Sequence, residues 1–349
     1  GDEVAADHAD AGIGHRRVRQ ALRERRFDLE AQLPGGLLRR VERHRVGDAQ
    51  AVAEALGVTF GAELLAHLRP RPDSLVWDVG GGTGALALDD QHFGWKIGHA
   101  QDHLALWDKH LSGINRSSAN VLELGTGWYP IVPVYFWLHG VNSMDSLDLY
   151  PWINAEHCQT TALKFVEWHS TGQLQPFLGN VDSARWAQLE LAAQDPMPLE
   201  SFLSMIGLRT LVGDATSAIA GMRTSYEFIC SNNTLEHILE APLVAILERF
   251  KGLLASGGGS SHFIDLSDHF GHFDRGITAY NFLKFSPLQW RLIDNDIQPQ
   301  NRLRWPQYLE IFTKLGYNVV EEGVRPGDVQ ELKKVKVHRS FAGMSDSEL

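Results

Sequence analysis

The segment Val121-Leu-Glu-Leu-Gly125-Thr-Gly127-Trp-Tyr-Pro130 decides the fold, because an apolar strand runs directly into a glycine turn and then into a helix. The helix, residues 131–138, is almost wholly apolar. Glycine at 125 and 127 lets the backbone turn sharply and approach a ligand with no Cβ in the way. Free N–H groups at the following helix start favour polar or anionic ligand atoms. The segment therefore predicts a ligand-binding loop at the carboxyl end of a strand.

Strand-like and helical segments alternate along the rest of the chain, which predicts a doubly wound, Rossmann-like α/β fold with helices on both faces of the sheet. The last two strand candidates, 317–323 and 333–341, are joined only by a loop. They predict an antiparallel terminal hairpin in a seven-stranded, mostly parallel sheet. The other candidates are strands at 142–147, 210–212, 226–230 and 262–266, and helices at 99–111 and 242–254, the second closed by glycines at 257–259.

The chain divides into three predicted parts. Residues 1–72 are arginine-rich, contain no lysine and predict a helical extension; 73–119 hold a strand with a glycine loop and a helix leading into the core; 120–349 form the main domain, with long insertions at 150–209 and 267–306. Long connections at the carboxyl ends of strands usually carry function. The glycine loop at Gly80–Gly84 also follows a strand-like segment and resembles the loop at Gly125–Gly127. No strand ending in an acid follows it at the distance that separates Gly125 from Asp148.

Composition excludes several classes of protein. With 349 residues, 44% hydrophobic and 21% charged, the chain is neither disordered nor fibrous. Its net charge of −11 argues against general nucleic-acid or anionic-membrane binding. The most apolar run, 130–138, is too short for a membrane span of about twenty residues. Two cysteines, Cys158 and Cys230, cannot build a disulfide framework. A reducing, cytoplasmic location is the expectation.

Acidic residues close the second and third predicted strands. Asp148, about 23 residues after Gly125, is placed to accept hydrogen bonds from both hydroxyls of a ribose. Asp214, after the third strand, is placed to meet an adenine amino group. Both patterns favour an adenosine-bearing ligand. A dinucleotide fingerprint would need a third glycine where Pro130 stands, which weakens a NAD reading.

These motifs together resemble the class I S-adenosylmethionine-dependent methyltransferases, particularly those that act on small molecules. The resemblance covers about 120–343 and rests on Glu123-Leu-Gly-Thr-Gly127, Leu147-Asp148, Gly213-Asp214-Ala215 and Asn233-Thr-Leu-Glu-His237. It implies S-adenosylmethionine as cofactor and methyl transfer to an O, N or C atom of a small-molecule acceptor. The cofactor-binding residues it implies are Glu123, Gly125, Thr126, Gly127, Asp148, Leu149, Asp214, Ala215, Asn232 and Asn233.

Histidines supply the candidate catalytic residues. A base is needed only if the acceptor arrives protonated, and His237, just past the fourth strand, is the first candidate. His269 is the second, from the cluster 262–274, which holds three histidines and three aspartates. This cluster could bind a metal or hold the substrate, or it could be purely structural. Strand alternation would split it between two faces, so no metal site is predicted. Aromatic residues in the second insertion could line a substrate pocket or pack a subdomain.

Two other functions remain open at this point. One is a NAD-dependent oxidoreductase, despite the missing third glycine. The other is a methyltransferase-like binding or regulatory protein that keeps the cofactor pocket without turnover, with the arginine-rich start as its partner surface. The sequence does not set an oligomeric state.

Overall fold

The computed structural model describes residues 88–349 except 273, 275 and 295–298, all within the unit Leu75–Leu349. The predicted helical extension at 1–72 and the loop Gly80–Gly84 lie outside the described residues. The described part is an α/β structure with one parallel sheet in the order β3-β2-β1-β4-β5. Its strands are β1 (Asn120–Leu124), β2 (Ser143–Asp148), β3 (Leu208–Val212), β4 (Tyr226–Asn232) and β5 (Leu254–Phe263).

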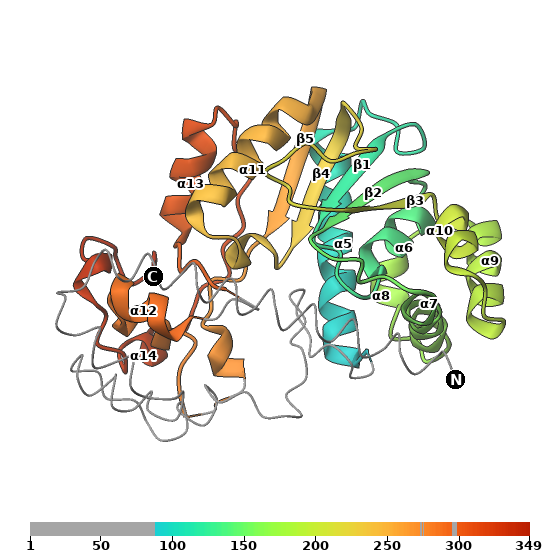
Figure 1. Ribbon diagram of the computed structural model, residues 1–349. Coiled ribbons are helices and arrows are strands. Elements are labelled where there is room, and N and C mark those ends of the chain that lie inside the picture. The colour runs from blue at the N-terminus through green and yellow to red at the C-terminus, as the bar shows by residue number, and fades with distance from the viewer. Residues whose placement is uncertain (1–87, 273, 275, 295–298) are drawn as a thin grey trace, which may run out of the picture. The chain divides into compact units, whose positions relative to one another are not determined.

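Helices cover both faces of this sheet (Figure 1). Side chains alternate along each strand, so Val121 joins the core beneath α5–α10 while Leu122 joins the core beneath α11 and α13. The α-helices are α5 (Asp90–His110), α6 (Ile131–Leu138), α7 (Ala155–Ser170), α8 (Gln175–Leu178), α9 (Ser183–Gln194), α10 (Leu199–Met205), α11 (Glu240–Leu253), α12 (Pro287–Ile293), α13 (Trp305–Lys314) and α14 (Val329–Leu332). Short 3₁₀ helices are η2 (Leu235–His237), η3 (His269–His272), η4 (Asn281–Lys284) and η5 (Arg339–Phe341).

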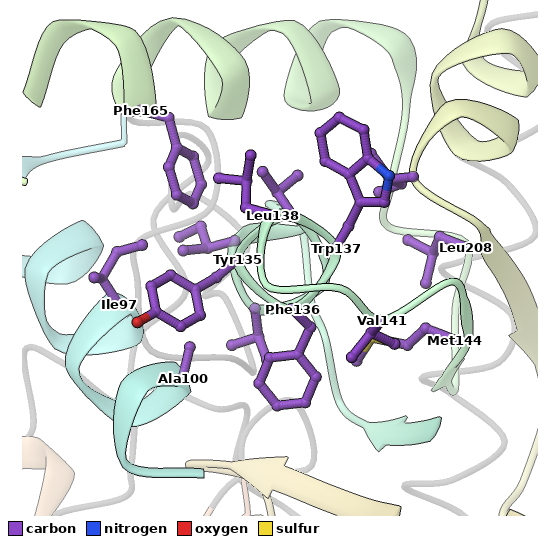
Figure 2. Packing of buried hydrophobic residues seen from close by; sticks show 14 of the residues in the cluster. Ile97, Ala100, Tyr135, Phe136, Trp137, Leu138, Val141, Met144, Phe165 and Leu208 are labelled. Carbon is purple, nitrogen blue, oxygen red and sulfur yellow. The ribbon is translucent and has the colours of Figure 1, made fainter. Parts of the chain in front are cut away.

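Helix α6 lies at the centre of the larger core. All eight of its side chains are buried, as expected of a helix that is apolar on every side. Figure 2 shows Tyr135, Phe136, Trp137 and Leu138 pointing outward in different directions, toward α5, α7 and the sheet. This packing fixes the helix that follows the glycine turn, and so fixes the turn itself.

The strand order places a topological switch point between β1 and β4. The chain runs from β1 outward through β2 to β3, and then returns to the other side of β1 for β4 and β5. Open α/β sheets bind ligands in the crevice outside the carboxyl ends of strands at such a point. The glycine turn after β1 and the segment after β4 both lie there.

The predicted terminal hairpin is wrong, and the sheet of the described residues has five strands, not seven. Residues 317–328 form neither strand nor helix, and 333–341 contain turns and η5. Side-chain contacts, in place of strand pairing, hold residues 317–328. Glu321 accepts hydrogen bonds from Lys109 and His110 at the end of α5, and Glu322 accepts one from the Trp305 indole. Val319 and Val320 in this segment are 40% and 63% exposed.

Strand β5 begins earlier than the sequence predicts. The glycines at 257–259, which the sequence predicts to close a helix, lie within the strand. The register between β4 and β5 shifts there, and a Cβ on Gly258 would lie 2.8 Å from the carbonyl oxygen of Glu227. The glycines therefore accommodate an irregular, close strand pairing. None of the helices in the described part of the chain has the length and apolar character needed to cross a membrane.

Candidate functional site

The turn after β1 requires glycine at both predicted positions. Gly125 and Gly127 have φ values of 76° and 78°, in the left-handed region. A Cβ on Gly125 would lie 2.3 Å from Oγ1 of Thr234, which follows β4. The Gly125 N–H also donates to the Leu147 carbonyl at 2.9 Å, so β2 holds the turn from the other side. The turn is thus fixed between the ends of β2 and β4, with no room for a Cβ at Gly125.

Asp148 lies directly beside this turn, as the sequence predicts. Its Oδ1 accepts from the Gly127 N–H at 3.4 Å and its Oδ2 from the Ser146 hydroxyl at 3.2 Å. Burial, and then the neighbouring Glu123, raise the pKa of Asp148 to about 7. The carboxylate is therefore held at an energetic cost, which a ligand with hydroxyl donors would offset.

Three other predicted cofactor residues form a buried network beneath the turn. Glu123 Oε2 accepts from Thr126 at 2.7 Å, and Glu123 Oε1 accepts from Asn232 Nδ2 at 3.1 Å. Asn232 Oδ1 accepts from His103 Nε2 at 3.1 Å, and the Asn232 carbonyl accepts from Lys96 Nζ at 3.1 Å. Burial raises the pKa of Glu123, and the Lys96 charge opposes that shift. These bonds position the turn; direct side-chain contact with a cofactor stays a prediction.

The carboxyl ends of β2 and β3 present exposed apolar surface around a second acid. Leu149, Tyr150 and Val212 are 61%, 53% and 47% exposed. The Gly213 N–H donates to the Asp148 carbonyl at 2.9 Å, which ties the two strand ends together. Asp214 is exposed, and its Oδ1 accepts from both the backbone N–H and the hydroxyl of Thr216. An apolar patch beside an acid is a suitable surface for a flat heterocycle with an amino group.

The remaining predicted cofactor residues lie on the same edge of the sheet. Ala215 is buried behind Asp214. Asn233 follows β4 with φ of 54°, a conformation that asparagine tolerates better than most residues. The structure therefore brings all ten predicted cofactor residues to one edge of the sheet.

Both predicted catalytic histidines lie together at the ends of β4 and β5. The rings of His237 and His269 are 4.8 Å apart, and His269 Nε2 lies 3.4 Å from Asp265 Oδ2. His237 Nδ1 donates to the Pro299 carbonyl at 2.9 Å, which leaves Nε2 as the basic atom. Burial, and then His269, lower the pKa of His237 to about 4, so its ring is neutral at pH 7.

Two other members of the histidine–aspartate cluster, His262 and Asp268, make separate contacts. The ring of His262 stacks on Phe312 of α13 with centroids 5.8 Å apart, and its Nδ1 bonds with Ser231 Oγ at 2.9 Å. Asp268 accepts from the Phe270 backbone N–H and from Asn281 Nδ2. Aromatic side chains of the second insertion mostly pack on one another around Trp290, so they form a small core and not an open pocket; they include Phe270, Phe282 and Phe285.

Sequence reasoning missed the polar residues of α5. Lys96, His99 and His103 are buried and recur at helical spacing on the face toward β4 and β5. The His99 ring stacks on Phe263 with centroids 3.9 Å apart, and burial lowers its pKa to about 3. A polar stripe within an otherwise core-facing helix was the available signal. Sequence reasoning also missed Glu236, a buried acid next to His237 in the chain. Burial raises the pKa of Glu236 to about 8.

A surface hollow lies away from the candidate site. Its lining includes Trp107, Ile114 and Arg116, near the amino ends of β1 and β2. It is therefore at the opposite end of the strands from the candidate site, and it contains none of the predicted site residues.

No protein-family model matches this chain, and no curated protein sequence matches it. Many of the solved structures that it resembles are S-adenosylmethionine-dependent methyltransferases. One, designated an O-methyltransferase, from Nostoc punctiforme PCC 73102, is 13% identical, with 64% of this chain and 51% of that one covered and a TM-score of 0.35. This chain thus spans about half of that protein.

Another, designated a sarcosine dimethylglycine methyltransferase, from Galdieria sulphuraria, is 15% identical over 70% of this chain and 72% of that one, with a TM-score of 0.38. A magnesium protoporphyrin IX methyltransferase from Synechocystis PCC 6803, with bound SAH, is 12% identical over 49% and 58%, with a TM-score of 0.28.

Proposed function

We propose that this protein transfers a methyl group from S-adenosylmethionine to an O, N or C atom of a small-molecule acceptor. The observation that carries the proposal is the pairing of Asp148 with the turn of Gly125 and Gly127 at the switch point of the sheet. A turn with two glycines in the left-handed region, beside an acid that is costly to ionise, suits a ligand with vicinal hydroxyls. The exposed apolar patch and Asp214 next to it suit an adenine ring.

Each predicted cofactor residue has a role in this arrangement. Asp148 would accept hydrogen bonds from the ribose hydroxyls, and Asp214 one from the adenine amino group. Leu149 would pack against the ring. The turn would hold the amino-acid part of the ligand against its backbone, where the buried Trp128 indole N–H has no hydrogen-bond partner among the described residues. Glu123, Thr126 and Asn232 would keep the turn in its binding conformation.

The acceptor would enter from the ends of β4 and β5. S-adenosylmethionine supplies a methyl group on a positively charged sulfur, which is already a good leaving group. The protein has mainly to align the acceptor with that methyl group, which can be worth up to ~7–11 kcal/mol. His237 and His269 line this side, and a neutral His237 could take a proton from a hydroxyl acceptor, typically worth about 10²–10⁴-fold. Residues 120–349 would form the catalytic domain, with the insertions at 150–209 and 267–306 beside the site.

The structure also bears on the NAD alternative. Pro130 immediately precedes α6, and Trp128, stacked on Trp152 with centroids 4.9 Å apart, occupies the turn before it. A pyrophosphate needs close approach to backbone N–H groups at this helix start. A proline and a bulky stacked indole are poorly suited to that role, which favours the sulfonium ligand over a dinucleotide.

Calorimetry with S-adenosylmethionine, S-adenosylhomocysteine and NAD tests the proposal on wild type and Asp148→Ala. We expect both sulfur ligands to bind wild type at one per chain, NAD to bind weakly or not at all, and the variant to lose affinity. Glu240→Ala, an exposed acid in the first turn of α11, is the control. Unchanged affinity in Asp148→Ala would contradict the ribose assignment. Binding without acceptor-dependent formation of S-adenosylhomocysteine would favour the non-catalytic alternative.

A further inference from the structure

A group of polar side chains lies at the ends of β4 and β5, on the side of the site that we propose for the acceptor. It consists of Glu236, His237 and His269, and one ligand atom from each lies within 4.8 Å of the other two. Glu236 and His237 are 2% and 6% exposed. Among the described residues, neither Glu236 Oε2 nor His237 Nε2 has a hydrogen-bond partner. Two buried polar atoms without partners, close together, require an explanation, because leaving one unpaired costs about 1–3 kcal/mol.

The partners of the other atoms in these side chains orient the free atoms. Glu236 Oε1 accepts from the Asp265 N–H at 3.2 Å, which leaves Oε2 available. His237 Nδ1 donates to the Pro299 carbonyl at 2.9 Å, which leaves the lone pair of Nε2 available. A histidine that binds a metal through one nitrogen usually donates its other N–H to a carbonyl or carboxylate. Glu236 Oε2 and His237 Nε2 are thus both available to bind one ligand between them.

The identity of the three side chains indicates the kind of ligand. Two imidazoles and one carboxylate form a common protein ligand set for zinc, with a coordination position left for water or substrate. Ligand atoms around such an ion are about 3.3 Å apart, so side chains now within 4.8 Å would close on it by small rotations. Asp265, whose Oδ2 lies 3.4 Å from His269 Nε2, is a further oxygen at the rim.

We propose that Glu236, His237 and His269 bind one divalent transition-metal ion of the zinc class. The ion would lie at the carboxyl ends of β4 and β5, where its open position faces the acceptor. If the proposed methyl transfer is correct, the ion would select acceptors with an oxygen donor able to coordinate it, such as a phenol, catechol or hydroxy acid. With the ion bound, His237 Nε2 would be a ligand and not a base, and the ion itself would lower the pKa of a coordinated acceptor hydroxyl. Metal binding does not depend on the proposed methyl transfer.

The test is metal binding by the full-length, metal-stripped protein. Calorimetry with Zn²⁺ and the visible absorption of Co²⁺, a spectroscopic substitute for zinc, should show a site in wild type that Glu236→Gln and His269→Gln lose. Glu236→Gln preserves volume and the oxygen that accepts from Asp265. Loss of an outer partner alone typically costs about 10–100-fold in metal affinity, so loss of a ligand should cost at least ~100-fold. The controls are Glu240→Gln, at an exposed position, and His338→Gln, at a partly exposed position outside the three-residue group. If ions bind to histidines elsewhere in the chain, the control variants will still show that signal.

Binding of S-adenosylhomocysteine by the same preparations separates the two proposals and reports whether each variant folds. If the variants bind S-adenosylhomocysteine like wild type but lose the Zn²⁺ and Co²⁺ signals, the metal site is supported. If they retain those signals, or if wild type shows none, the metal site is refuted whatever the cofactor result. If the metal signals behave as expected and S-adenosylhomocysteine does not bind wild type, the metal site stands and the proposed function fails.

Discussion

The unusual state of Asp148 predicts a pH dependence for cofactor binding. Its pKa is raised to about 7, and a ribose needs the ionised form as hydrogen-bond acceptor. The carboxylate fraction falls from about 90% at pH 8 to about 10% at pH 6, so S-adenosylhomocysteine should bind about tenfold more weakly at pH 6, a change of about 1.4 kcal/mol. Calorimetry at pH 6, 7 and 8 measures this directly. The ligand's own amino and carboxyl groups lie outside this pH range.

The substitution Asp148→Asn isolates this effect. The Asp148→Asn variant should bind S-adenosylhomocysteine weakly at every pH, so its affinity should no longer depend on pH. Asp214→Asn should also bind more weakly, but its affinity should keep the pH dependence of wild type. Because the folded state favours the protonated acid, the stability of the ligand-free protein should fall as pH rises from about 4 to about 7. Asp148→Asn should therefore stabilise the ligand-free protein at pH 8, by about 1–3 kcal/mol after allowance for solvent at this half-buried site. A flat wild-type profile, or the same slope in Asp148→Asn, would refute the reasoning.

Three further predictions concern the surroundings of the site. Lys96→Met removes the cation that lowers the pKa of Asp148, so the midpoint of the binding profile should move above pH 7; a profile identical to wild type would contradict this coupling. Gly125→Ala should lower the thermal midpoint by more than Gly172→Ala: both have φ near +80°, costing about 1–2 kcal/mol, but only Gly125 has Thr234 in the way. Equal losses would mean that Thr234 moves aside freely. Tyr226→Phe removes a 2.6 Å hydrogen bond to the buried Asp145 carboxylate and should lower the free energy of unfolding in urea by about 1.5–3 kcal/mol. The loss should exceed that of Tyr317→Phe, because the partner of Tyr317 is a neutral carbonyl. The affinity for S-adenosylhomocysteine should not change.

Much of the sheet could be predicted because its signals are local. An apolar strand followed by a glycine turn and an apolar helix allows few conformations, and β1 through α6 form as expected. Asp148 could be placed beside the turn because parallel strand ends share one edge of a sheet. His237 was predicted just past the fourth strand, whereas its contact with the ring of His269 emerged only from the structure.

What could not be predicted depended on distant contacts. Residues 317–323 have the composition of a strand, but Glu321 binds side chains at the end of α5, and nothing in the local sequence indicates that pairing. The glycines at 257–259 resemble a helix terminator, and only the neighbouring strand β4 makes them part of β5. Likewise, Lys96 and His103 become part of the site only because α5 packs across β4 and β5.

The most direct test of the central claim is a crystal structure of the protein with S-adenosylhomocysteine. The account predicts the ligand at the carboxyl ends of β1 and β2, with both ribose hydroxyls on Asp148 and its amino-acid end against Gly125–Gly127. The sulfur would point toward the ends of β4 and β5. A ligand bound at another edge of the sheet, or with its ribose away from Asp148, would contradict it.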